Sequence, residues 1–146
     1  MPIHFFSEEI NFKIESPNKF KKWLKSTAEA EGFKIKALNY IFCNDQYLNS
    51  INREFLNHDD FTDIITFDNS ETTRNIEGDI YISIERVKQN AETFGTSFYI
   101  ELSRIIIHGL LHLTGHKDKL PKEKAFMTSK ENEYLFKINI VPRGTI

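Results

Sequence analysis

Ile107-His108-Gly109-Leu110-Leu111-His112-Leu113-Thr114-Gly115-His116-Lys117-Asp118 is the stretch from which the organisation of this chain follows. Its first half continues a helix that is predicted to begin after a cap at Thr96 or Ser97. The apolar residues of this helix are Leu102, Ile105, Ile106, Leu110, Leu111 and Leu113. A helix with such a broad apolar face is stable only when other elements cover it, so we expect it to be mostly buried.

The rest of the chain supplies the elements that cover this helix. Strands are predicted at residues 10–14, 33–42, 63–67 and 79–83. Further helices are predicted from Pro17 (with Ser16 as N-cap) to Gly32, from a cap at 44–45 to Phe55, over 85–94, and from about 121 to before 142. Residues 57–60 are predicted to be a turn and residues 68–77 an exposed connection. We therefore predict an α+β fold in one domain spanning residues 1–146, with a single small mixed β-sheet and several helices packed on it.

The composition bounds the environment and the partners. The 146 residues include one cysteine, Cys43, so no disulfide forms within the chain, as expected in a reducing compartment. We see no secretory signal and no apolar stretch of membrane-spanning length, so we expect a cytoplasmic protein with no membrane partner. The net charge of −2 argues against indiscriminate nucleic-acid binding but permits a local basic groove. Lysines form two clusters: Lys19, Lys21, Lys22 and Lys25, then Lys117, Lys119, Lys122 and Lys124.

Two histidines of the central helix are spaced to bind one metal ion. His108 and His112 are four residues apart and share a face of the helix. His116 would lie about 12 Å along the axis from His108 if the helix continued, which is too far. Gly115 can adopt a positive φ and end the helix, which lets Asp118 turn back to the ion as a third ligand. These three ligands leave a fourth position open, as is typical of catalytic zinc. We therefore predict one zinc ion per chain, bound by His108, His112 and Asp118.

Other interpretations of these histidines fit the sequence less well. A single histidine on such a helix is usually a core residue, and structural zinc sites usually have four ligands rich in cysteine. Helical zinc peptidases carry a glutamate directly after the first histidine as general base. This chain has Gly109 there, which disfavours peptide hydrolysis. Without a side chain at Gly109, a substrate or a neighbouring strand can approach the helix closely.

Three segments of the chain resemble the YbeY family of rRNA maturation factors, which are zinc-dependent, single-strand-specific endoribonucleases. They are residues 108–115, residues 62–67 (Thr-Asp-Ile-Ile-Thr-Phe) and residues 78–83 (Gly-Asp-Ile-Tyr-Ile-Ser), in the order and spacing of the family. The resemblance implies zinc at the two helix histidines and at a third ligand six residues after the second. It also implies a part in maturing the 3′ end of small-subunit rRNA and in ribosome quality control. The implied partners are single-stranded RNA or rRNA and the ribosome or its proteins.

The chain departs from the pattern of that family at three positions. Asp118 stands where the third ligand is commonly histidine, and a carboxylate is also a competent ligand. Leu56 stands where the family has an arginine. Arg53 lies one helical turn earlier on nearly the same face, so we consider it the substitute for that arginine. His116 stands where the family often has tyrosine.

Cleavage of a phosphodiester bond is the reaction that these features predict. The metal is expected to polarise a phosphoryl oxygen and to activate a water, with the ribose 2′-hydroxyl as the alternative nucleophile. We expect Arg53, Thr66 and Lys117 to bind the substrate and offset its charge. His116 is the candidate proton donor, beside Arg53 as a catalytic group. Two other functions stay open: a ribosome-assembly or RNA-binding factor with a structural metal, and a metallohydrolase acting on peptides or small molecules.

Overall fold

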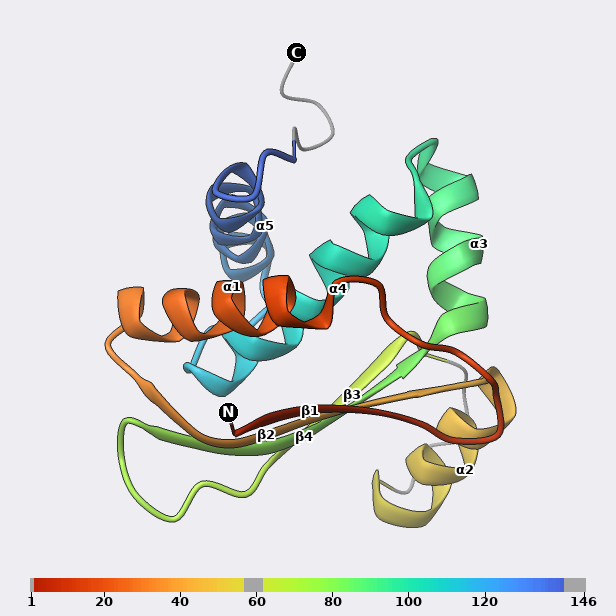
Figure 1. The fold of residues 1–146 in the computed structure, drawn as a ribbon, viewed down its shortest axis with the longest axis horizontal. Coiled ribbons are helices and arrows are strands. Elements are labelled where there is room, and N and C mark those ends of the chain that lie inside the picture. The colour runs from red at the N-terminus through yellow and green to blue at the C-terminus, as the bar shows by residue number, and fades with distance from the viewer. Residues whose placement is uncertain (1, 57–61, 141–146) are drawn as a thin grey trace.

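A four-stranded sheet forms one layer of the protein, seen in a computed structural model that describes residues 2–56 and 62–140 (Figure 1). Its strands are β1 (Ile3–Ser7), β2 (Lys34–Cys43), β3 (Ile64–Asp68) and β4 (Asn75–Ser83), in the spatial order β1-β2-β4-β3. β1, β2 and β4 run parallel, and β3 pairs antiparallel with β4. The sheet is therefore mixed, and β3 closes it at one edge.

Within residues 2–56 and 62–140, five helices accompany this sheet. The helices are α1 (Pro17–Ala30), α2 (Asp45–Leu56), α3 (Ile84–Phe94), α4 (Phe98–Leu113) and α5 (Pro121–Phe136). α1, α4 and α5 lie on one side of the sheet and α2 on the other (Figure 1). The main core is formed where α1 and α4 pack on strand residues such as Tyr40 and Ile80, and a smaller cluster lies under α2 around Leu48 and Ile65. No helix among the described residues has the length and apolar character of a membrane span.

α4 is the most deeply enclosed helix, as its apolar sequence predicts. It contacts α1, α3, α5, β3 and β4, and the side chains of Ile106, Ile107, Leu110 and Leu111 are fully buried. Gly109 lets the sheet approach: a Cβ placed there would lie 2.9 Å from Ile80 Cδ1 and 3.1 Å from Ile64 Cδ1. Two neighbouring strands thus occupy the space that the missing side chain leaves.

The predicted α+β class with one small mixed sheet is confirmed, but the first strand was predicted in the wrong place. Residues 3–7 form the strand, whereas residues 10–14 form no ladder. Ile10, Phe12 and Ile14 are still partly buried against the core, which explains their alternating pattern. Glu9 has a φ of 64°, so the backbone leaves the sheet direction directly after β1.

The predicted helix limits hold with local differences. Ser16 does precede α1, but its φ of 52° places it in the left-handed region and its side chain makes no cap. Asn44 caps α2 by accepting from the Tyr47 amide at 2.8 Å, and Ser97 rather than Thr96 caps α4.

β4 begins at Asn75, inside the predicted connection. Phe55, where the second helix was predicted to end, is 60% exposed, and α2 continues to Leu56. The predicted turn at 57–60 lies outside the described residues.

Gly78 is a second position where the packing of α4 requires glycine. A Cβ there would lie 2.7 Å from Leu113 Cδ1 and 2.9 Å from the Phe67 carbonyl oxygen, and the latter belongs to the backbone of β3. We expect Gly78→Ala to lower the free energy of unfolding by about 1–3 kcal/mol because the strand pair must shift. Chemical denaturation of the metal-free protein measures this loss. Glu77→Ala, at the neighbouring half-buried position, serves as the control and should cost less than about 1 kcal/mol.

Candidate metal centre

The end of α4 brings three candidate metal ligands together. His108 and His112 project from successive turns, and the helix stops at the C-cap Thr114. Gly115 has a φ of 99°, its amide donates to the His112 carbonyl at 3.0 Å, and the His116 amide donates to the Leu111 carbonyl at 3.1 Å. These two bonds form the Schellman motif that reverses the chain direction after a helix. The reversal carries Asp118 back to the two histidines.

The spacing of the three ligand atoms fits one metal ion. His108 Nε2 and His112 Nε2 are 3.0 Å apart, and Asp118 Oδ2 lies 3.3 Å from each of them. Ligand atoms about 2.0–2.1 Å from a tetrahedral zinc ion lie about 3.3 Å from one another. Among the described residues, these three form the cluster whose ligand atoms all fall within 4.8 Å. The donor set of two imidazoles and one carboxylate is one that zinc accepts, with a fourth position left for another ligand.

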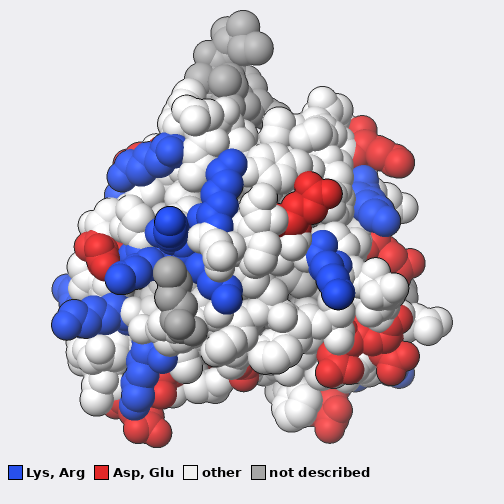
Figure 2. Space-filling view, viewed as in Figure 1, with Lys and Arg blue, Asp and Glu red and all other residues white. Residues whose placement is uncertain are grey.

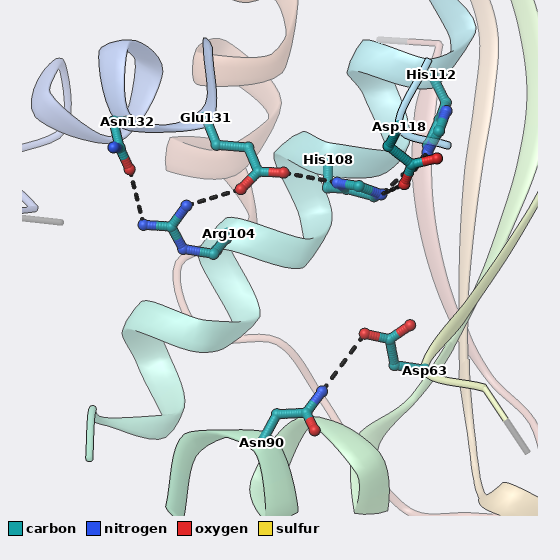
Figure 3. Close-up of polar contacts among 8 residues, drawn as sticks. All are labelled: Asp63, Asn90, Arg104, His108, His112, Asp118, Glu131 and Asn132. Carbon is teal, nitrogen blue, oxygen red and sulfur yellow. Dashed lines mark hydrogen bonds and ion pairs between the residues drawn. The ribbon is translucent and has the colours of Figure 1, made fainter. Parts of the chain in front are cut away.

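Glu131 of α5 holds the ring of His108 from the opposite side (Figure 3). Its Oε2 lies 2.6 Å from His108 Nδ1, which leaves Nε2 directed at Asp118 and His112. Its other oxygen accepts from Arg104 at 2.7 Å, and Arg104 also donates to Asn132 at 2.9 Å. A carboxylate on the far nitrogen of a ligating histidine selects the tautomer that can bind metal and raises the basicity of the ring.

The two histidines have opposite electrostatic environments. Burial by itself lowers the pKa of His108, but the hydrogen bond and charge of Glu131, with smaller contributions from Asp118 and Asp63, raise it above the usual value. The pKa of His112 is lowered, mainly by burial and then by the neighbouring His108. A neutral His112 has a lone pair available for a metal at neutral pH, which is what coordination requires.

A cleft of about 520 Å³ opens in front of the three ligands. Its walls come from α2 (Asn52 and Leu56), from residues 62–66 and Asp68, and from Leu113 beside the ligands. Asp63 lies in this wall, accepts from Asn90 at 3.4 Å, and has a pKa that burial raises (Figure 3). No lysine or arginine is among the described residues that line the cleft. A divalent cation would therefore offset carboxylate charge that the lining itself does not balance.

Of the three predicted substrate-binding residues, one lines the cleft and two do not. Thr66 lines the cleft directly. Arg53 and Lys117 are exposed and follow or precede a lining residue in the chain, but neither lines the cleft itself. Leu56, at the position where the resemblance calls for arginine, is a lining residue and is 43% exposed.

His116 is turned away from the ligands toward α1 and α5. Its Nε2 lies 2.6 Å from Glu31 Oε1, and its ring packs against Phe126 with centroids 5.5 Å apart. It is absent from the residues that line the cleft. This geometry does not support the role of proton donor predicted for His116.

Lysines of the first cluster border a hollow other than the cleft. Lysine and arginine side chains gather over the α1 side of the molecule, whereas aspartate and glutamate gather toward the opposite lower corner of the same view (Figure 2). Lys19, Lys22 and Lys137 border a separate hollow of about 500 Å³ beside Trp23. The hollow that these lysines border is thus separate from the candidate metal centre.

Sequence reasoning missed Glu131, Arg104 and Glu31. Arg104 and Glu131 are buried charged residues on helices that the sequence reads as amphipathic or apolar. Arg104 offered a signal, because a charge within a mostly apolar helix needs a buried counter-charge. Which carboxylate supplies it depends on the packing of α5 against α4.

Two histidines and a carboxylate that line a cleft in an α+β fold are the donor set expected of a metal-dependent hydrolase. Comparison with known proteins identifies the family. The family model described as "Endoribonuclease YbeY" matches residues 3–139, so the chain belongs to the YbeY family.

Individual relatives agree with this assignment. A protein of Cytophaga hutchinsonii named endoribonuclease YbeY is 51% identical over 133 residues, which cover 91% of this chain and 93% of the relative. A protein of the same name from Amoebophilus asiaticus is 42% identical over 139 residues, 95% of each chain. A Thermotoga maritima protein of known solution structure shares the fold, with a TM-score of 0.63 at 24% identity, covering 93% of this chain and 91% of that one.

Glu131 should control the affinity of the centre for metal. We expect Glu131→Gln to weaken zinc binding by about 10- to 100-fold because His108 loses its carboxylate partner. Competition with a chromogenic chelator measures the affinity. Glu133→Gln removes an exposed carboxylate from the same helix and is the matched control. Equal zinc affinity in the two variants would contradict the role of Glu131.

Proposed function

We propose that this protein is a zinc-dependent endoribonuclease that cleaves single-stranded RNA, acting in maturation of the 3′ end of small-subunit rRNA and in ribosome quality control. The convergence of His108, His112 and Asp118 in the lining of the cleft carries this proposal. Membership of a family whose curated members are named endoribonucleases supports the reaction type. We propose zinc in particular because two imidazoles and one carboxylate are typical ligands of catalytic zinc.

The residues of the chain have separate tasks in this proposal. His108, His112 and Asp118 hold the ion, and Glu131 orients His108 through Nδ1. A divalent ion held there supplies Lewis acidity, which stabilises negative charge developing on a phosphodiester. Thr66 offers a hydroxyl within the cleft wall. Arg53 and Lys117, exposed beside the cleft, attract the phosphates on either side of the scissile bond.

The chief alternative is a ribosome-assembly factor that binds RNA while the metal only stabilises the fold. Leu56 favours this alternative, because an apolar side chain lines the cleft where a cation would assist cleavage. Peptide hydrolysis has less support. Gly109 follows His108, and the side chains of Ile64 and Ile80 occupy the space that a side chain there would need. The position therefore has no room for a general base.

Loss of the metal should abolish cleavage. We expect chelation, or His112→Ala, to lower the rate of cleavage of a single-stranded RNA by more than about 100-fold, since loss of a residue that only orients a metal ligand already costs about 10- to 100-fold. Gel analysis of a labelled oligonucleotide measures the rate. Circular dichroism checks that the variant folds. A folded, metal-free His112→Ala protein that cleaves RNA at the wild-type rate would exclude a role of the metal in cleavage. A zinc-loaded wild type that binds the RNA without cleaving it would favour the assembly factor.

Leu56 offers a gain-of-function test that separates the two readings. If the cleft cleaves RNA, Leu56→Arg places a cation beside the phosphate, and we expect about a tenfold higher kcat/KM, equal to about 1.4 kcal/mol of transition-state stabilisation. Leu56→Gln, which is polar but uncharged, is the matched control. Arg53→Ala should lower kcat/KM by a similar factor. RNA binding that strengthens in Leu56→Arg without any cleavage would support the assembly factor instead.

A further inference from the structure

The segment that presents Asp118 is a connection without regular structure. It joins the last turn of α4, at Leu113, to the first turn of α5, at Pro121. Asp118 is therefore not held by a helix ladder as His108 and His112 are. A third ligand on such a connection stays at the distance that a metal requires only when neighbouring groups fix the segment.

His116 ties this segment to the rest of the protein. Its Nε2 donates to Glu31 Oε1 over 2.6 Å, across 85 positions of the chain. Its side chain is 18% exposed, and that of Glu31 only 10%. The bond is thus largely shielded from water, where a charge-assisted hydrogen bond has its greatest effect on geometry.

Glu31 is itself fixed by two helices. It is the C-cap residue of α1, where its amide donates to the carbonyls of Thr27 and Ala28. From α5 its second oxygen accepts from the Tyr134 hydroxyl and, at 3.3 Å, from Lys130 Nζ. Burial raises the pKa of Glu31, but the hydrogen bonds from Tyr134, His116 and Lys130 outweigh it and lower the pKa overall. The carboxylate is therefore a rigid, ionised acceptor for His116.

We propose that Glu31 and His116 are positioning residues of the metal centre, and that the hydrogen bond between them holds Asp118 in place against His108 and His112. Residues 130 and 131 of α5 then act on both sides of the site. Lys130 helps to fix Glu31, and Glu131 fixes His108. One helix thereby sets the distance between the ligands on α4 and the ligand on the connection. This inference rests on the proposed metal site.

Zinc affinity of the full chain tests this inference without any measurement of RNA cleavage. Competition with a chromogenic chelator gives the affinity of the wild type, His116→Ala, Glu31→Gln and the double variant. We expect each single variant to bind zinc about tenfold more weakly or worse. We expect the double variant to be no weaker than the weaker single variant, because both substitutions remove the same bond. His116→Gln, which keeps an amide donor near the position of Nε2, should recover part of the affinity.

Two further measurements separate positioning from general loss of stability. Ser83→Ala removes the N-cap of α3, and the Ser83 side chain is not among the described residues that line the cleft, so the variant should destabilise the metal-free protein and leave zinc affinity unchanged. Denaturation of each metal-free variant gives the comparison. Wild-type affinity in His116→Ala, additive losses in the double variant, or an equal loss in Ser83→Ala would overturn the inference. A wild type that binds no zinc would overturn the metal site as well, so the two failures are distinguishable.

Discussion

Burial of α4 is the constraint on which the rest of this structure depends. The helix is covered by the sheet on one side and by α1, α3 and α5 around it, and Gly109 and Gly78 let the strands approach. Close packing of this kind leaves little freedom for the helix to shift or rotate. The two histidines are therefore held at one edge, where β3 and α2 leave a cleft. Core packing thus sets the position of the two histidines relative to each other without a bound ion.

Charge compensation inside the protein is the second feature that shapes the site. Arg104 and Glu131 are more than nine-tenths buried, and Glu131 also contacts His108. Removing one member of such a set leaves a buried charge without compensation, which is strongly destabilising. Glu31 has the same character on the other side of α5, with three donors around one carboxylate. α5 thus connects the stability of the fold to the geometry of the metal centre.

The lining of the cleft carries carboxylates, whereas the cations proposed to bind RNA lie outside that lining. The cleft is lined by Asp63, Asp68 and Asp118 and, within the described part of the chain, by no lysine or arginine. Such a lining attracts a divalent cation more readily than it attracts RNA. In the proposed endoribonuclease, the ion and the cations at the rim must therefore provide the attraction for phosphate. The charge at positions 53 and 56 of α2 therefore affects how strongly the cleft attracts phosphate.

The sequence alone determined the α+β class, the buried central helix and the three candidate ligands, because each rests on local rules. Each signal can be recognised within about a dozen residues. The signals are the helical period of 3.6 residues, two histidines four residues apart, and a glycine that ends a helix. The sequence favoured residues 10–14, where apolar and polar residues alternate, over residues 3–7, where Phe5 and Phe6 are adjacent. Residues 3–7 form the first strand because they pair with β2. The contacts of Glu131 with His108 and of Glu31 with His116 span 23 and 85 positions. Only the tertiary structure decided them, because a pairing at such a distance follows from how helices pack and not from any pattern along the chain.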